Sequence, residues 1–122
     1  MRVSAAHRRH WQERLIRERE ACARRLTQAL PAADRCAGAL KRRWPAIEGV
    51  WLFGSAVEGT FGMDSDLDLA VEGLPNPDLL DAMAEAQGAA YGETDLVVDL
   101  VRLESLPPHW QRRIRDRGRR LL

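Results

Sequence analysis

Residues 66–71 constrain the fold more than any other part of this 122-residue chain, because acidic and apolar residues alternate along them as DLDLAV. A period of two is the period of a β-strand, so Asp66 and Asp68 point to one face while Leu67 and Leu69 point to the other. We therefore expect a strand that packs on one face and carries two carboxylates on the other.

The segments around this strand predict a small mixed sheet with packed helices, an α/β fold of the α+β kind. An apolar stripe at spacings of three, four and seven predicts helix within residues 1–44, where Pro31 either kinks the helix or opens a second one. The pattern also predicts strands at 49–53 and 95–103, helices at 78–90 and 107–117, and a short last strand at 121–122. We expect two parts, an N-terminal helical extension at 1–44 and one compact unit at 45–122.

The net charge of +1 conceals a strong asymmetry along the chain. Residues 1–44 carry a net charge of +8, residues 45–105 a net charge of −12, and residues 106–122 a net charge of +5. An acidic middle between basic ends indicates a cation-binding centre beside a rim that attracts anions. The same acidic middle would repel a polyanion, which argues against a nucleic-acid partner.

The apolar residues are spread through the chain rather than gathered into long runs. No run approaches the roughly 18 residues of a membrane span, which argues against a membrane partner. Residues 1–10 lack the apolar centre of a signal peptide. We therefore expect a cytoplasmic protein.

The paired aspartates indicate a metal site. Asp66 and Asp68 have Cα atoms about 6.5 Å apart on a strand, and two carboxylates this close repel each other unless a cation neutralises them. Mg²⁺ is a hard cation that takes one or two carboxylates and leaves its other positions to water and phosphate. Asp99, on the strand at 95–103, would complete a two-metal arrangement suited to phosphoryl or nucleotidyl transfer. Asp95 shares the face of Asp99 and remains an alternative third ligand.

A Gly-Ser pair directly follows the strand at 49–53. Gly54 lets a bound anion approach the backbone, and the N–H groups and the Ser55 hydroxyl that follow can donate to phosphate oxygens. Neither this pair nor an Asp-x-Asp is specific alone, but their order and separation together point to a nucleotide site.

The stretch GSAVEGTFGMDSDLDLAV resembles the signature of the polymerase β-type nucleotidyltransferases, which is Gly-Ser, ten residues, then Asp-x-Asp. It is most similar to the minimal bacterial and archaeal subgroup called MNT. The stretch VDLVRLESLPPHWQRRI resembles that family's third-carboxylate strand and the Leu-Pro-Pro helix after it. The resemblance covers residues 48–120.

The resemblance implies a sheet that holds two Mg²⁺ ions and transfers a nucleotide from a nucleoside triphosphate, usually ATP. It makes Asp66 and Asp68 ligands of both metals. Asp99 becomes the third ligand and assists deprotonation of the attacking hydroxyl. Gly54 and Ser55 would contact phosphate, and Ser65 matches a small polar residue common before the Asp pair.

One residue departs from the family pattern. The family often has Ala-Arg-Gly shortly after Gly-Ser, where this chain has Val57-Glu58-Gly59. Glu58 places an anion where a cation could hold phosphate, which argues against tight ATP binding unless an arginine from the basic ends reaches in. Arg102, the only basic residue of the acidic middle, is another candidate.

The resemblance also implies a partner. Minimal chains of this subgroup resemble the antitoxin of a pair whose toxin is a helical HEPN-type ribonuclease, and they transfer AMP to a tyrosine of that toxin. A small-molecule acceptor, as in aminoglycoside nucleotidyltransferases, usually requires an additional substrate-binding domain, for which we expect no room here. A third hypothesis is a catalytically inactive module that neutralises a partner by binding it.

Overall fold

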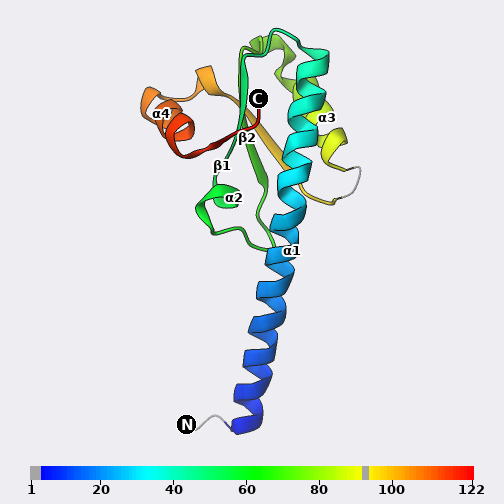
Figure 1. The fold of residues 1–122 in the computed structure, drawn as a ribbon, viewed down its shortest axis with the longest axis vertical. Helices are drawn as coiled ribbons and strands as arrows, with labels where there is room; N and C mark the ends of the chain where they lie inside the picture. The colour runs from blue at the N-terminus through cyan, green and yellow to red at the C-terminus, as the bar shows by residue number, and fades with distance from the viewer. Residues whose placement is uncertain (1–3, 92–93) are drawn as a thin grey trace.

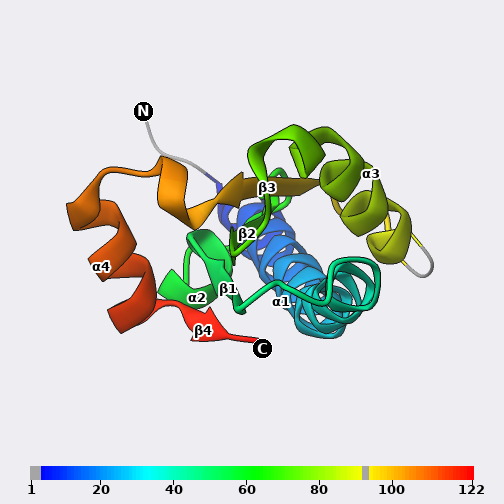
Figure 2. The same cartoon turned by 90° about the horizontal axis from the view of Figure 1, so that it is seen from above.

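The computed structural model describes residues 4–91 and 94–122, in which a four-stranded mixed sheet carries helices on both faces (Figures 1 and 2). The elements in chain order are α1 (Ala5–Arg43), β1 (Gly49–Phe53), α2 (Ser55–Glu58), β2 (Leu67–Glu72), the 3-10 turn η1 (Asn76–Asp78), α3 (Leu79–Ala90), β3 (Val98–Arg102), the 3-10 turn η2 (Leu103–Ser105), α4 (Pro108–Arg117) and β4 (Arg119–Arg120). The predicted small mixed sheet with packed helices is confirmed.

The strand order is β3-β2-β1-β4, and β2 is the strand that alternates acid and apolar residues. It pairs antiparallel with β1 and parallel with β3, while β4 pairs antiparallel with the far edge of β1. The last strand lies at 119–120 rather than at 121–122 as predicted, because the extended backbone of Gly118 ends α4 and turns the chain directly into the pairing with β1.

One face of the sheet packs against α1 and α3, which lie on the same side in Figure 2. Leu67, Leu69 and Val71 of β2 are fully buried on this face, as the period of two requires. The two helices meet through small residues, since α1 and α3 bury mainly alanines here. The thiol of Cys36 on α1 donates a hydrogen bond to the carbonyl of Ala86 on α3, with Sγ and O 3.2 Å apart.

The other face of the sheet packs against α4 (Figure 2). A small second core joins Trp51 of β1, Ala70 of β2, Leu103 of η2 and Ile114 of α4. Asp68 lies on the same face as Ala70, two residues before it, so this is the face that carries the acidic side of β2.

Helix α1 runs from Ala5 to Arg43 as one helix with Pro31 inside it, so no second helix opens at Pro31. Its second half packs into the core from Ala29 to Leu40, whereas residues 4–20 are exposed and project from the domain (Figure 1). The division of the chain at residue 44 stays a prediction. In the part of the chain that the structure describes, no helix is both long and apolar enough to span a membrane.

Candidate active site

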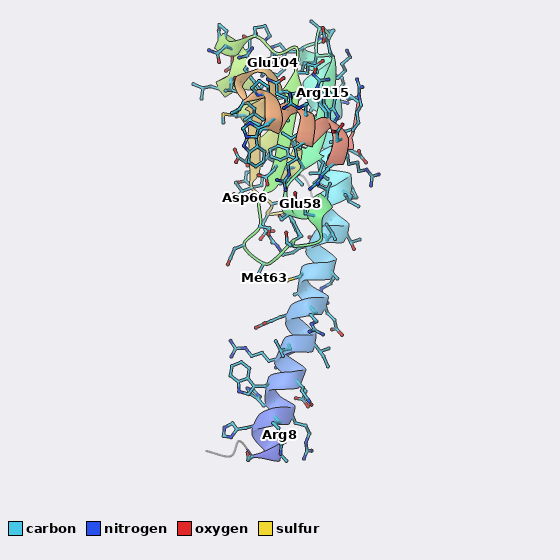
Figure 3. All side chains as sticks on the ribbon, turned by 90° about the vertical axis from the view of Figure 1, so that its left-hand side faces the viewer. Arg8, Glu58, Met63, Asp66, Glu104 and Arg115 are labelled. Carbon is cyan, nitrogen blue, oxygen red and sulfur yellow. The ribbon has the colours of Figure 1, made fainter. Side chains whose placement is uncertain are left out.

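The strand register brings two of the predicted carboxylates side by side. Asp68 of β2 is the Cα partner of Asp99 in β3 on one side and of Phe53 in β1 on the other. Asp66 lies two residues before Asp68, so the period of two places it toward the same face. Asp68 is half-buried, and Asp66 and Asp99 are exposed. We call Asp66, Asp68 and Asp99 together the acidic row. The row lies at the ends where β2 and β3 begin, and Figure 3 places Asp66 at the rim of the domain from which α1 projects.

The carboxylate of Asp68 lies in surroundings that disfavour its negative charge. Burial, together with the nearby negative charges of Asp99 and Asp66, raises its pKa from 3.8 to about 6, and burial has the largest effect. Among the described residues, no lysine or arginine forms an ion pair with any of the three carboxylates. These three carboxylates are thus a set of oxygen donors whose charge no ion pair within the described residues offsets.

This donor set fits Mg²⁺ by its chemistry, since hard cations bind carboxylate oxygens and would remove the repulsion that raises the pKa of Asp68. The side chains as placed do not yet surround a common point, and within residues 4–91 and 94–122 no three His, Cys, Asp or Glu groups form a ready-made metal cage.

Position 54, directly beside the acidic row, requires a glycine. Its φ of +75° and ψ of −148° lie in a region that residues with a Cβ rarely enter. A Cβ here would also lie 2.3 Å from Oδ2 of Asp68, so the carboxylate occupies the space that any side chain at 54 would need. Ser55 begins α2 directly after Gly54.

The loop before β2 is held by hydrogen bonds that the sequence did not indicate. The Oγ of Ser65 accepts from the N–H of Gly62 at 2.8 Å and closes the loop. Arg25 of α1 donates to the Ser65 carbonyl at 3.5 Å and to Oδ1 of Asp95 at 3.3 Å. Asp95 therefore lies outside β3, bonded to α1, while the register places Asp99 beside Asp68.

Glu58 does not stand as an unpaired anion. Its Oε1 accepts from Nη2 of Arg113 on α4 at 3.1 Å, so an arginine from the basic C-terminal segment reaches the position that the sequence left in question. Arg102 does not reach it. The Arg102 guanidinium donates to the Leu74 carbonyl at 2.7 Å and to Ser105, at the far end of β3.

Two pockets flank the acidic row on the α4 face and meet at Phe53, Asp68 and Trp110. The first, about 260 Å³, extends past Gly54 toward α4, and we call it the Gly54 pocket; its remaining lining residues are Val57, Glu58, Arg113, Ile114, Arg117 and Gly118. The second, about 330 Å³, extends past Asp99, and we call it the Asp99 pocket; its remaining lining residues are Val101, Leu106 and Pro107.

Sequence reasoning missed the contribution of α4 to the site. Trp110, Arg113, Ile114 and Arg117 follow one another at spacings of three, one and three, which is one face of a helix. This spacing is visible in the sequence, but only the fold shows that the face borders the same pocket as Gly54, with Ile114 buried and the other three side chains exposed.

Comparison with known proteins identifies the family of the fold. The family described as polymerase beta, nucleotidyltransferase matches residues 36–122. No curated protein matches the chain.

Several solved structures share the fold. A chain of a toxin-antitoxin complex with AMP-PNP is 28% identical, with a TM-score of 0.59, over 73% of this chain and 72% of that chain. A chain of a variant of the toxin-antitoxin complex MntA-HpeT is 30% identical, with a TM-score of 0.53, over 68% of this chain and 66% of that chain. A third similar chain comes from a tri-AMPylated Shewanella oneidensis HEPN toxin in complex with MNT antitoxin. It is 24% identical, with a TM-score of 0.51, over 77% of this chain and 71% of that chain.

Proposed function

The chain belongs to the polymerase β nucleotidyltransferase family, and we propose that it transfers AMP from ATP to a hydroxyl group of a partner protein, as the antitoxin of a pair with a HEPN-type toxin. The observation that carries the proposal is the register of β2 and β3. It sets Asp68 beside Asp99, with Gly54 in contact with the Asp68 carboxylate.

Asp66, Asp68 and Asp99 are the residues that would hold Mg²⁺, and the family resemblance suggests two ions. Bound metal would offset the negative charge that collects on the attacking, leaving and phosphate oxygens. The raised pKa of Asp68 supports this assignment, because its environment disfavours the negative charge that a bound cation would stabilise.

The chain's own residues account for the other requirements of the reaction. Gly54 lets phosphate approach the backbone, and Ser55 donates from its amide and hydroxyl. Asp99 takes the proton of the acceptor hydroxyl. The hydroxyl oxygen then forms a bond to the α-phosphorus of ATP, the bond to the β-phosphate oxygen breaks, and pyrophosphate leaves.

A protein acceptor is supported by the openness of the site and by the relatives. Asp66 and Asp99 are exposed, so a hydroxyl carried on another protein surface can reach them. The similar chains at 28% and 30% identity come from toxin-antitoxin complexes, and one of these complexes contains the ATP analogue AMP-PNP. These relatives favour a toxin as the acceptor over a small molecule.

The experiment that tests this function is transfer of labelled AMP. The purified chain is incubated with a HEPN-type toxin, Mg²⁺ and ATP labelled at the α-phosphate, and the toxin is analysed for label and for the added mass of AMP. We expect label on a toxin tyrosine, its loss in Asp99→Asn, and its retention in the matched control Asp95→Asn. Label that survives Asp99→Asn but not Asp95→Asn would move the third carboxylate to Asp95.

A second candidate function is neutralisation of the toxin by binding alone. Glu58 at the mouth of the Gly54 pocket favours this candidate, because an anion there opposes phosphate. In that case the chain would protect against the toxin without ATP, and the Asp99→Asn variant would protect as well as the unaltered chain.

A further inference from the structure

The Gly54 pocket is lined by one face of α4 that carries two arginines. Arg113 and Arg117 are one helical turn apart, and both line the pocket together with Gly54 and Asp68. The pocket therefore joins the acidic row to a basic helix face, which is the charge arrangement expected of a site for an anion held beside a metal.

Arg113 is fixed in place from two sides. Nη2 lies 3.1 Å from Oε1 of Glu58, and the guanidinium carbon lies 5.5 Å from the ring centroid of Trp110. A guanidinium has five N–H donors, and the pair with Glu58 uses one of them. Arg113 can hold Glu58 and still donate to phosphate oxygens.

Arg117 adds positive charge that no acid of the described residues offsets through an ion pair. Among the described residues it forms no ion pair, whereas Arg115 on the same helix pairs with Glu72 of β2. With Arg113 and Glu58 cancelling each other, Arg117 leaves the α4 side of the Gly54 pocket with a net positive charge.

The geometry of the transfer reaction indicates which part of the nucleotide donor this positive charge would bind. In phosphoryl transfer the attacking and leaving oxygens lie on opposite sides of the phosphorus, roughly in line. Asp99, which takes the proton of the acceptor, faces the Asp99 pocket. The leaving pyrophosphate must then extend to the opposite side of Asp68, where the Gly54 pocket lies.

From these contacts we propose that Arg113 and Arg117 of α4 bind the β- and γ-phosphates of the donor, and that Glu58 positions Arg113 instead of excluding the nucleotide. The inference rests on the proposed function, since it assigns the donor site of that reaction.

The test measures dissociation constants for ATP and for AMP, with Mg²⁺, by calorimetry on the full chain. The variants are Arg113→Gln, Arg117→Gln and the matched control Arg115→Gln, which removes a guanidinium from α4 outside the pocket. Figure 3 places Arg115 well away from Glu58.

We expect Arg113→Gln and Arg117→Gln each to weaken ATP binding about tenfold or more, because each removes a charge-assisted hydrogen bond to phosphate. AMP binding should not change, and Arg115→Gln should bind both nucleotides as the unaltered chain does.

Two results would overturn the inference. Unchanged ATP affinity in both variants would mean that α4 does not contact the triphosphate, and equal weakening for ATP and AMP would place the arginines under the nucleoside instead. Arg117→Gln breaks no ion pair of the described residues, and a thermal melt of both variants shows whether either one fails to fold. If the unaltered chain itself bound no ATP, the proposed function would fail rather than this assignment.

Discussion

At the scale of single residues, the site depends on how closely the backbone at Gly54 approaches the carboxylate of Asp68. The two groups leave no room for a methyl group between them, since a Cβ would come within 2.3 Å of Oδ2. Gly59, at the other end of α2, has a similar φ of +80° and no atom within 4 Å of a built Cβ. Substitutions at Gly54 and Gly59 can therefore distinguish the effect of backbone strain from the effect of a clash with the Asp68 carboxylate.

We predict that Gly54→Ala abolishes Mg²⁺-dependent ATP binding and lowers the free energy of unfolding by about 1–3 kcal/mol. Gly59→Ala should cost about 1–2 kcal/mol of strain and leave ATP binding intact. Calorimetric titration and chemical denaturation of both variants provide the comparison. Intact ATP binding by the Gly54→Ala protein would show that the site does not need this close approach.

The pKa of Asp68 makes a second residue-level prediction. The folded chain holds this proton up to a pH of about 6, against 3.8 for an unperturbed aspartate. A raised folded pKa gives stability that is fully present below the unfolded value and is lost as pH rises through the folded value. Between about pH 4 and pH 6, Asp68 therefore lowers the free energy of unfolding of the metal-free chain as pH increases.

Asp68→Asn should remove this contribution. Metal-free Asp68→Asn should be more stable than the unaltered chain at pH 7.5 by on the order of 1 kcal/mol, a value reduced for partial exposure to solvent. The difference should shrink toward pH 4. Denaturation at several pH values, with Asp64→Asn as the exposed control, measures it. A deficit at pH 7.5 for the Asp68→Asn protein would mean that the carboxylate stabilises the fold.

At the scale of elements, the period-two pattern was sufficient to predict β2 and the direction of its acidic residues. The strand at 49–53 is confirmed to the residue, and the helix predicted at 78–90 differs from α3 by one residue. Local patterns predict such elements because periodicity and glycine or proline boundaries are encoded within a few residues.

The sequence did not predict which elements meet. The predicted strand at 95–103 shortens to β3, because Asp95 leaves the strand to bond Arg25 of α1, 70 residues away. The pairing of Glu58 with Arg113 spans 55 residues in the same way. Contacts of this range follow from packing and have no local signal.

The contact of α1 with α3 gives an element-level prediction. Ala86 is fully buried between these helices, whereas Ala84, on the same helix, is exposed. Ala86→Leu should lower the free energy of unfolding by about 1–3 kcal/mol, because the close-packed interface has no space for the larger side chain. Ala84→Leu should change it by less than about 0.5 kcal/mol. Equal effects of the two substitutions in urea denaturation would contradict close packing of α1 on α3.

At the scale of the whole molecule, the projecting part of α1 lies outside both hydrophobic clusters of the domain. Residues 4–20 are exposed throughout, and Trp11 keeps 55% of its surface in solvent. We predict that removal of residues 1–20 shifts the thermal midpoint by less than about 2 °C, because no residue of the described part of this segment, 4–20, belongs to the buried core. A larger fall in differential scanning calorimetry would mean that this segment stabilises the domain.

One part of the site follows from residue type and spacing, and the other part follows only from the whole fold. Asp66, Asp68 and Asp99 could be proposed from residue type and spacing, because carboxylates at a period of two on one strand are costly without a cation. The α4 side of the site could not, since Arg113 and Arg117 are two of six arginines in residues 106–122 and only the fold separates them.

The most direct test of the account is titration of the chain with ATP, with and without Mg²⁺, by calorimetry, beside a variant with Asp66→Asn and Asp68→Asn together. The account predicts binding that requires Mg²⁺ and that the double substitution abolishes while the fold, followed by circular dichroism, stays intact. Binding that persists in the double variant, or that does not depend on the metal, would contradict the assignment of this acidic row as the nucleotidyl-transfer site.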